Sequence, residues 1–224
     1  MKGLHNLNPP RPRYTHTWDV SIVLRLLKSY SPNESLSLET LTFKLVMLVA
    51  LVTGQRSQSL SLLDTREATV TQSTVSFHIT QPTKTSKPGS KPHAVTLTAY
   101  PADEQLCVRS VLREYLKRTR KFRKDNPFLF ISTRSPHRNV TSQTISRWLK
   151  KVLQVAGVDT SIFKAHSTRS ASASAAFRQG VSTDVLMSTV GWSSEKTFAR
   201  FYNKPLSSDK DTYSNAILSI VNRI

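Results

Sequence analysis

The sequence predicts a mainly α-helical domain with one small antiparallel β-sheet, which is an α+β fold. Two patterns predict it: helical periodicity of apolar residues over most of the chain, and a single β-branched block near residues 68–97. A third observation is the apolar content of 38%, which is enough to bury a core and argues against disorder. With 224 residues, the chain has room for one large domain, or for a main domain with a small appendage.

The first part of the chain predicts an extended arm followed by two helices. Residues 1–15 are rich in proline and predict an arm or linker, whereas residues 16–224 predict the domain itself. A helix is expected over 17–30, and a second helix is expected to begin at the cap Ser37 and to end at Gly54. The apolar run inside this second helix is much shorter than a membrane span requires, so it predicts a buried helix.

Three β-branched pieces predict the strands of the sheet, and they lie at 69–71, 75–80 and 94–97. Between the last two, residues 83–92 combine turn formers with lysines and predict a basic hairpin. The rest of the chain predicts helices, apart from a short strand-like piece at 128–131. The expected helices are 105–118, one that begins at Thr141 or Ser142 and carries an apolar stripe to Leu153, 168–179, 183–190, 194–202 and 209–222.

The net charge of +18, from 32 Lys and Arg against 14 Asp and Glu, indicates a partner that is a polyanion. DNA or RNA is the leading candidate, although composition alone fits a generic basic protein equally well. Cys107 is the only cysteine, which excludes an internal disulfide and a cysteine-based zinc site and suits a reducing compartment. The N-terminus shows no cleavable signal, and no membrane partner is expected.

Two clusters of cations are candidates for contacts with DNA. Seven of the twelve positions between Arg113 and Lys124 are Lys or Arg, which predicts either phosphate contact or a solvated helix end. Arg147, Lys150 and Lys151 lie off the apolar stripe of their helix, so this helix could lie along a groove of a duplex.

The residues that carry chemistry follow one another in a fixed order. Arg56 comes directly after the buried helix, and the lysine-bearing hairpin follows it. His166 and Arg169 form a His-x-x-Arg pair at the start of a helix, whose backbone amides add positive potential. Trp192 lies twenty-three residues after Arg169, and Tyr202 lies ten residues after Trp192. Taken one at a time, these residues have ordinary structural explanations: a core aromatic, a helix cap, a packing tryptophan.

In this order and at these spacings, the chain resembles the tyrosine recombinase (phage integrase) superfamily over about residues 40–205. The resemblance implies the catalytic-domain fold of that family, and a set of catalytic residues made up of Arg56, Lys84, His166, Arg169, Trp192 and Tyr202. The strings Thr-Gly-Gln-Arg-Ser-Gln-Ser-Leu, His-Ser-Thr-Arg-Ser-Ala-Ser and Gly-Trp-Ser-Ser-Glu-Lys-Thr-Phe-Ala-Arg-Phe-Tyr look like recombinases of DIRS-type retrotransposons. Because these are eukaryotic mobile elements, the narrower resemblance implies a nuclear protein.

The resemblance also implies a role for each residue. Two arginines clamp the phosphate oxygens, and the tryptophan donates its indole N–H. The histidine either donates a hydrogen bond or helps to remove the tyrosine proton. Tyr202 attacks to give a 3′-phosphotyrosyl link, and a hairpin lysine gives a proton to the leaving 5′-oxygen. Lys84 is the expected lysine, with Lys87 as the alternative, and Lys87 and Lys91 are expected to contact DNA. The reaction needs neither a metal nor a small-molecule cofactor.

Two positions depart from the family pattern. The family often carries an acidic residue three positions after the first arginine, and here that position is Ser59, so Gln58 is a candidate for orienting Arg56. Many members place the tyrosine nine residues after the His or Trp, and here that position is Phe201. Tyr213 is the nearby competitor, but it lacks the Phe-Tyr-Asn-Lys-Pro context.

The resemblance implies double-stranded DNA as the partner, with self-association as a dimer or tetramer on DNA. The family's N-terminal core-binding domain is expected to be absent from this chain. The expected C-terminal helix at 209–222 could pack on a neighbour or on its own domain. Two other functions stay open: a transposon-derived DNA-binding protein that no longer cuts, and a type IB topoisomerase, which uses the same chemistry to relax supercoils.

Overall fold

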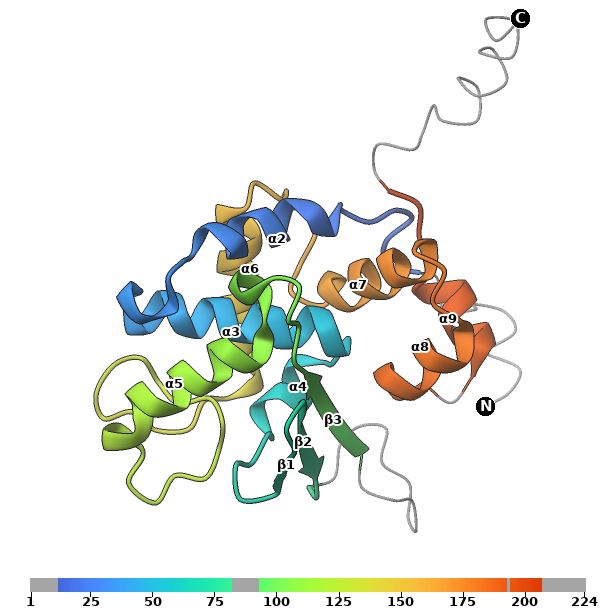
Figure 1. Cartoon of the computed structure of the whole chain (residues 1–224). Helices are drawn as coiled ribbons and strands as arrows, with labels where there is room; N and C mark the ends of the chain where they lie inside the picture. The colour runs from blue at the N-terminus through green and yellow to red at the C-terminus, as the bar shows by residue number, and fades with distance from the viewer. Residues whose placement is uncertain (1–11, 82–92, 193, 207–224) are drawn as a thin grey trace, which may run out of the picture.

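A central helix surrounded by other helices, with one small sheet at its side, organises the fold (Figure 1). The computed structural model describes residues 12–81, 93–192 and 194–206. The central helix is α3 (Leu38–Thr53), and it packs against α5 (Val108–Arg123), α6 (Ser142–Val155) and α7 (Ser167–Arg178). The predicted fold class, mainly helical with a small antiparallel sheet, is confirmed.

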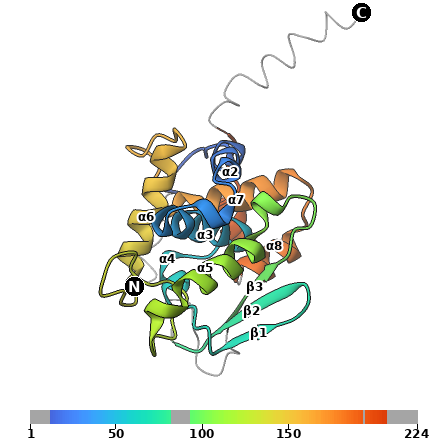
Figure 2. The same ribbon diagram turned by 60° about the vertical axis from the view of Figure 1, so that its left-hand side comes forward.

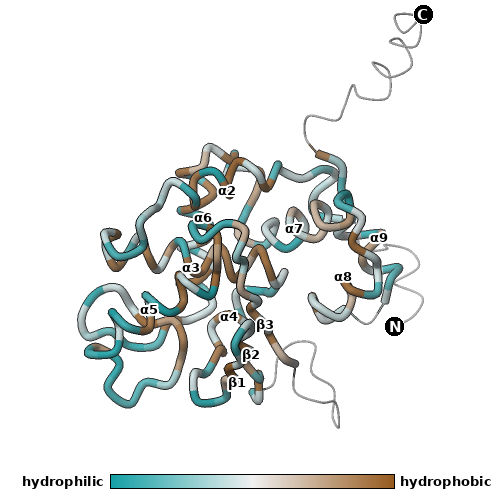
Figure 3. The backbone as a smooth tube through the Cα atoms, in the orientation of Figure 1, coloured by the Kyte–Doolittle hydropathy of each residue, from teal (hydrophilic) through white to brown (hydrophobic). Residues whose placement is uncertain are grey.

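Helix α3 has the boundaries that its capping residues predict. The Ser37 hydroxyl accepts a hydrogen bond from the Thr40 amide at 3.0 Å, and Gly54 ends the helix in the left-handed conformation. Every residue from Leu45 to Leu51 is buried, and Figure 3 shows this helix as one of the most apolar parts of the chain. Lys44 is fully buried as well, and its ammonium donates to the Tyr30 carbonyl and the Asn33 side chain.

The sheet has three antiparallel strands in the order β1 (Ala68–Val70), β2 (Thr74–Ile79), β3 (His93–Thr98). Val75 pairs with Leu97 and Phe77 pairs with Val95, so the buried side chains of the two strands lie opposite one another. Their alternation with half-buried residues in β2 and exposed residues in β3 fixes which face of the sheet meets the core. The segment that joins β2 to β3, where the basic hairpin is predicted, lies outside the described residues.

Helices α7, α8 (Thr183–Val190) and α9 (Glu195–Phe201) form a second apolar cluster, separate from the main core. Two contacts near the N-terminus tie this cluster to the rest of the domain. The Trp18 indole donates to the Ser167 hydroxyl at 2.9 Å, and the Thr17 amide donates to the Pro205 carbonyl at 2.8 Å. The chain just before α2 (Val20–Ser29) thereby holds both the start of α7 and the segment that follows α9.

Four elements differ from the sequence-based expectation. Helix α2 begins at Val20 rather than at residue 17, because the Asp19 side chain caps it. Helix α5 begins at Val108, after a 3-10 turn at Glu104–Leu106, and it continues to Arg123 because long-chain Lys and Arg residues favour the helix. A short helix, α4 (Ser57–Ser61), was not predicted. The piece at 128–131 makes only two isolated bridges, Asp64 to Phe128 and Ile131 to Asn139.

The expected helix at 209–222 lies outside the described residues. Within the described ranges, no helix is long and apolar enough to cross a membrane.

Candidate active site

A hollow of about 370 Å³ opens where α4, α6 and the start of α7 meet. Figure 2 shows α6 standing beside α4, with α7 to their right, behind α3. The lining residues come from the turn after α3, from α4, from α6 and from the start of α7: Gln55, Arg56, Ser57, Gln58, Ser142, Ser146, Leu149, Ala165, His166 and Arg169. Three of the predicted catalytic residues, two arginines and a histidine, therefore share one cavity.

Arg169 is the most deeply buried cation of this site, with 2% of its surface exposed. Its Nη1 donates to the Gly54 carbonyl at 2.7 Å, and its Nη2 donates to the Val190 carbonyl at 3.1 Å. Burial, followed by repulsion from Arg56, lowers the Arg169 pKa to about 10, and the Tyr202 phenol opposes this shift. The guanidinium therefore keeps its charge at neutral pH and is held in one orientation.

Gly54 makes this arrangement possible in two ways. Its φ of +59° is in the left-handed region, which favours glycine. A Cβ atom at this position would also lie 2.9 Å from a methyl group of Val190, the residue whose carbonyl accepts the second Arg169 bond. The end of α3 and the end of α8 can thus approach closely enough for one guanidinium to bridge them.

Tyr202 lies directly after α9, with its ring against the other predicted catalytic side chains. Its ring centroid is 4.5 Å from that of Trp192 and 6.3 Å from that of His166. The Arg169 guanidinium carbon lies 5.5 Å from the Tyr202 ring and 4.8 Å from the Trp192 ring. Although the spacing from Trp192 to Tyr202 is ten residues, the structure brings the tyrosine to Arg169, His166 and Trp192.

The backbone around Tyr202 is held by two serines of α7. The hydroxyls of Ser170 and Ser174 both donate to the Tyr202 carbonyl, the first at 3.2 Å. The Lys204 amide donates to the Ser174 hydroxyl at 3.0 Å, and Arg178 donates to the Lys204 carbonyl at 3.0 Å. One face of α7 therefore positions the tyrosine segment, and the start of the same helix carries His166 and Arg169.

His166 lies at the first turn of α7 and remains exposed at the edge of the hollow. Partial desolvation by the surrounding helices lowers its pKa, and the positive charges of Arg56, Arg169 and Arg13 lower it further. The imidazole is consequently neutral at neutral pH, which is the form that can accept a proton.

Arg56 lies between α3 and α4, where it occupies the N-cap position of α4. Its guanidinium makes no hydrogen bond or ion pair with any described residue, so its donors are open to the hollow. The neighbouring Ser57 accepts a hydrogen bond from Ser146 at 2.9 Å, which fixes the start of α4 against α6. Ser59, which replaces the acidic residue of the family pattern, is buried on α4, while Gln58 lines the hollow beside Arg56.

Two buried donors of the site have no acceptor among the described residues: Nε of Arg169 and Nε1 of Trp192. A buried N–H group without an acceptor is costly, and such groups are rare in folded proteins. Arg169 lines the hollow, and an oxygen-rich anion is the chemical group that would satisfy donors of this kind.

Residues 22–208, which are 187 of the 224 in the chain, match the Phage integrase family. The chain belongs to the phage integrase family. The resemblance to the tyrosine recombinase (phage integrase) superfamily that the sequence motifs indicated is thereby confirmed. No curated protein matches the sequence of this integrase-family chain.

Solved structures of recombinases and of lambda integrase share the fold. The chain is similar to the XerH site-specific recombinase bound to palindromic difH substrate in a post-cleavage complex (TM-score 0.65, 18% identity, 93% of this chain and 54% of that chain). It is also similar to the XerA recombinase (TM-score 0.64, 22% identity, 94% of this chain and 68% of that chain). A third similar structure is a lambda integrase dimer bound to a COC′ core site (TM-score 0.54, 19% identity, 84% of this chain and 48% of that chain). The integrase-family chain described here thus spans about half the length of XerH.

The predicted DNA-contacting residues fall into two groups. Arg147, Lys150 and Lys151 are all exposed on α6, the helix whose other face lines the hollow. The hairpin residues Lys84, Lys87 and Lys91 lie outside the described residues, as does Tyr213, so their roles stay predictions.

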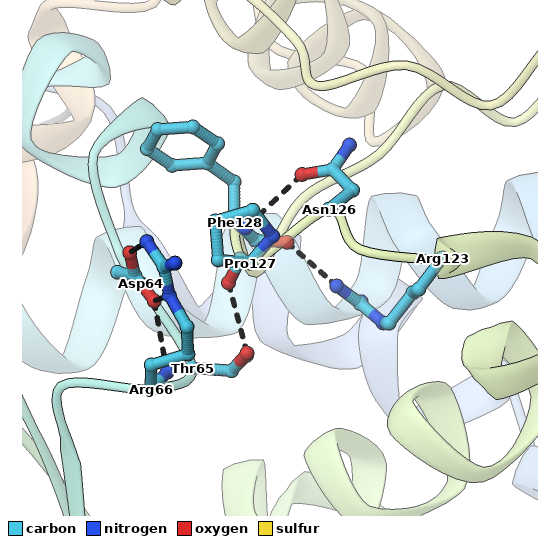
Figure 4. A network of polar contacts seen from close by, with 7 residues as sticks. All are labelled: Asp64, Thr65, Arg66, Arg123, Asn126, Pro127 and Phe128. Carbon is cyan, nitrogen blue, oxygen red and sulfur yellow. Dashed lines mark hydrogen bonds and ion pairs between the residues drawn. The ribbon is translucent and has the colours of Figure 1, made fainter.

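Two cations of the run on α5, for which the sequence predicts phosphate contact or a solvated helix end, have a structural role instead. Arg123 donates to Thr119 at 2.9 Å and to the carbonyls of Phe128 and Leu129, each at 2.6 Å (Figure 4 shows the first of these carbonyl bonds). Its guanidinium is therefore committed to holding the chain that follows α5. Arg118 likewise donates to the Leu36 carbonyl at 2.5 Å. Sequence patterns could not distinguish these two cations from their exposed neighbours.

Proposed function

We propose that this protein cuts and rejoins DNA through a covalent bond between Tyr202 and a 3′-phosphate. The observation that carries the proposal is the placement of the Tyr202 ring against Trp192 and the buried Arg169. Arg169 itself lines the hollow that also holds Arg56 and His166. Two buried N–H donors without acceptors, on Arg169 and Trp192, belong to the side chains that contact this ring. A tyrosine that only filled the core would leave these donors unexplained.

The cations account for the chemistry at phosphorus. A phosphodiester repels nucleophiles, and negative charge grows on its non-bridging oxygens in the transition state. Arg56 and Arg169 present planar, permanently charged forks that fit these oxygens, and the Trp192 indole can donate one further hydrogen bond. Charge that is oriented before the reaction is usually the largest contribution to catalysis. Arg169 meets this condition because two main-chain carbonyls fix it.

The proton balance assigns roles to two further groups. The Tyr202 oxygen bonds to phosphorus while its proton passes to the neutral His166, and the bond from phosphorus to the 5′-oxygen breaks. The leaving 5′-oxygen takes a proton from the hairpin, with Lys84 as the proposed donor and Lys87 as the alternative. Rejoining reverses these steps, because the phosphotyrosyl bond replaces the phosphodiester without hydrolysis.

Double-stranded DNA is the proposed substrate, and two or four copies of the protein are proposed to act together on it. The net charge of +18 and the exposed cations of α6 support the first proposal. Relatives of the same fold support the second, since lambda integrase is solved both as a dimer on a core site and as a tetramer on a Holliday junction.

We further propose that the protein acts for a mobile element of the DIRS type in a eukaryotic nucleus. The three sequence strings around Arg56, His166 and Tyr202 support this origin.

The test uses a nicked duplex that releases a short oligonucleotide after cleavage, so that the covalent complex cannot be reversed. Protein and duplex are mixed without divalent metal, and DNA-bound protein is detected in denaturing gels. We expect an adduct with the wild type and none with Tyr202→Phe, while both bind the duplex equally. Binding without any adduct would contradict the proposal and indicate a DNA-binding protein that does not cut. Tyr30→Phe, which alters a tyrosine of the α2 end, is the matched control and should form the adduct.

A further inference from the structure

Between α5 and α6, residues 131–139 form a compact loop that carries two exposed arginines. Ile131 and Asn139 close it as an antiparallel bridge, and the Ser132 amide donates to the Arg138 carbonyl at 2.7 Å. Arg134 and Arg138 are exposed, and within the described residues their guanidinium groups make no hydrogen bond or ion pair. The loop thus holds its backbone by internal bonds and leaves both arginines unused.

His137 fixes this loop from the inside. Its Nδ1 donates to the Ser132 carbonyl at 2.8 Å, since a carbonyl oxygen can only accept. Its ring stacks on Phe122 of α5, with 4.4 Å between the centroids and 24° between the planes. Its φ of +55° is in the left-handed region, which is uncommon for a residue with a side chain. These contacts fasten the loop to the end of a core helix.

The loop and α6 together form an unbroken positive segment. From residue 126 to residue 158 the sequence contains five Lys and Arg residues and no Asp or Glu. Those cations are Arg134, Arg138, Arg147, Lys150 and Lys151, and all five are exposed. A solvated surface normally mixes both signs, so a stretch of 33 residues with one sign indicates an anionic partner.

The loop lies close to the catalytic hollow. Arg138 is only four residues before Ser142, which lines the hollow, so their Cα atoms are at most about 14 Å apart. In Figure 2 the yellow-green chain between α5 and α6 lies beside the lower end of α6, next to α4. Each strand of B-DNA carries one phosphate per about 3.4 Å of axis. The maximum distance between Arg138 and Ser142 therefore corresponds to the spacing of roughly four phosphates.

We propose that the loop from Ser132 to Asn139 is a second contact with the DNA backbone. In it, Arg134 and Arg138 bind phosphates within about four nucleotides of the cleaved bond, and His137 and Phe122 are positioning residues that fix the loop. This inference rests on the proposed function, because it takes the phosphate in the hollow as its reference point. A rigid loop loses little conformational freedom on binding. The stacking of His137 on Phe122 therefore favours phosphate binding by holding the loop in one conformation.

The test measures how duplex binding depends on salt, with every variant made in the Tyr202→Phe background so that no covalent complex forms. Each phosphate contact contributes about 0.9 to the slope of log Kobs against log salt concentration. The Arg134→Ala/Arg138→Ala variant should lower this slope by about 1.8. Arg25→Ala/Lys28→Ala removes the same charge from α2, at the top of Figure 1 and away from α4, and should leave the slope unchanged.

The positioning role has its own variant. Phe122→Leu removes the stacked ring without changing the net charge, and it should lower the slope by about 0.9 if the loop loses one contact. An unchanged slope in the double arginine variant would overturn the contact, and an unchanged slope in Phe122→Leu would overturn the positioning role. Adduct formation by the wild type is scored separately, so a protein that shows the slope change but no adduct would contradict only the proposed function.

Discussion

Replacement of Gly54 by alanine tests how the end of α3 builds the site. The residue combines a φ of +59° with a carbonyl that accepts the Arg169 bond at 2.7 Å. A Cβ atom would lie 2.9 Å from one methyl of Val190 and 3.3 Å from the other. Because both Gly54 and Val190 hold Arg169 through their carbonyls, the added methyl group pushes apart the two anchors of the guanidinium.

The cost has two parts that can be separated. A left-handed backbone with a side chain costs about 1–2 kcal/mol, and the forced contact with Val190 adds about 1–3 kcal/mol. Gly157→Ala supplies the first part alone, since its φ is +85° and its Cβ would meet nothing within 4 Å. Gly54→Ala should therefore lower the free energy of unfolding by about 2–5 kcal/mol, and Gly157→Ala by about 1–2 kcal/mol.

Urea unfolding followed by circular dichroism measures both variants, and the adduct assay is run where each is fully folded. In Gly54→Ala the rate of adduct formation should fall about 100-fold, because the displaced Arg169 no longer meets the phosphate correctly. Gly157→Ala should keep the wild-type rate. Equal stability losses in the two variants, or a wild-type rate in Gly54→Ala, would refute the reasoning about this close approach.

Three further predictions concern the other side chains of the site. Trp192→Phe keeps an aromatic ring but loses the buried N–H, so single-turnover adduct formation should slow by about 10²–10³-fold. Ser174→Ala leaves the Lys204 amide without its acceptor and should lower the free energy of unfolding in urea by about 1–3 kcal/mol, whereas Ser188→Ala, at an exposed position, should not. His166 must be neutral to accept a proton and its pKa is lowered, so the adduct rate should stay level at neutral pH and fall only below pH of about 6.5. A His166→Gln variant should be slower and lose this acidic limb, and a limb that persists would contradict the assignment.

Much of the fold follows from local signals. Ser37 and Gly54 mark the two ends of α3 because one caps backbone amides and the other adopts a left-handed backbone. The strands follow from alternating β-branched residues, and the observed bounds differ from the expected ones by one residue at most ends. The order and spacing of the catalytic residues were sufficient to predict the family, since one constellation accounts for positions that are individually unremarkable.

The contacts that hold the site were not predictable, because they join residues that are far apart in the sequence. Ser170 and Ser174 look like ordinary small helix residues, yet both hold the carbonyl of Tyr202, about thirty positions away. The pairing of Arg169 with the Gly54 carbonyl spans 115 positions. Exposed and structural cations on α5 have the same side chains, and only the bonds of Arg118 to Leu36 and of Arg123 to the following loop separate them.

The site of the covalent bond is the most direct test of the account. The trapped adduct is digested with trypsin and nuclease, and the peptide that retains a nucleotide is identified by mass spectrometry. Trypsin cuts after Arg200 and Lys210 but not before Pro205, so Tyr202 and Tyr213 fall in different peptides, 201–210 and 211–223. The account predicts a nucleotide on Tyr202 in the first peptide. A nucleotide on Tyr213, or on any other residue, would contradict it.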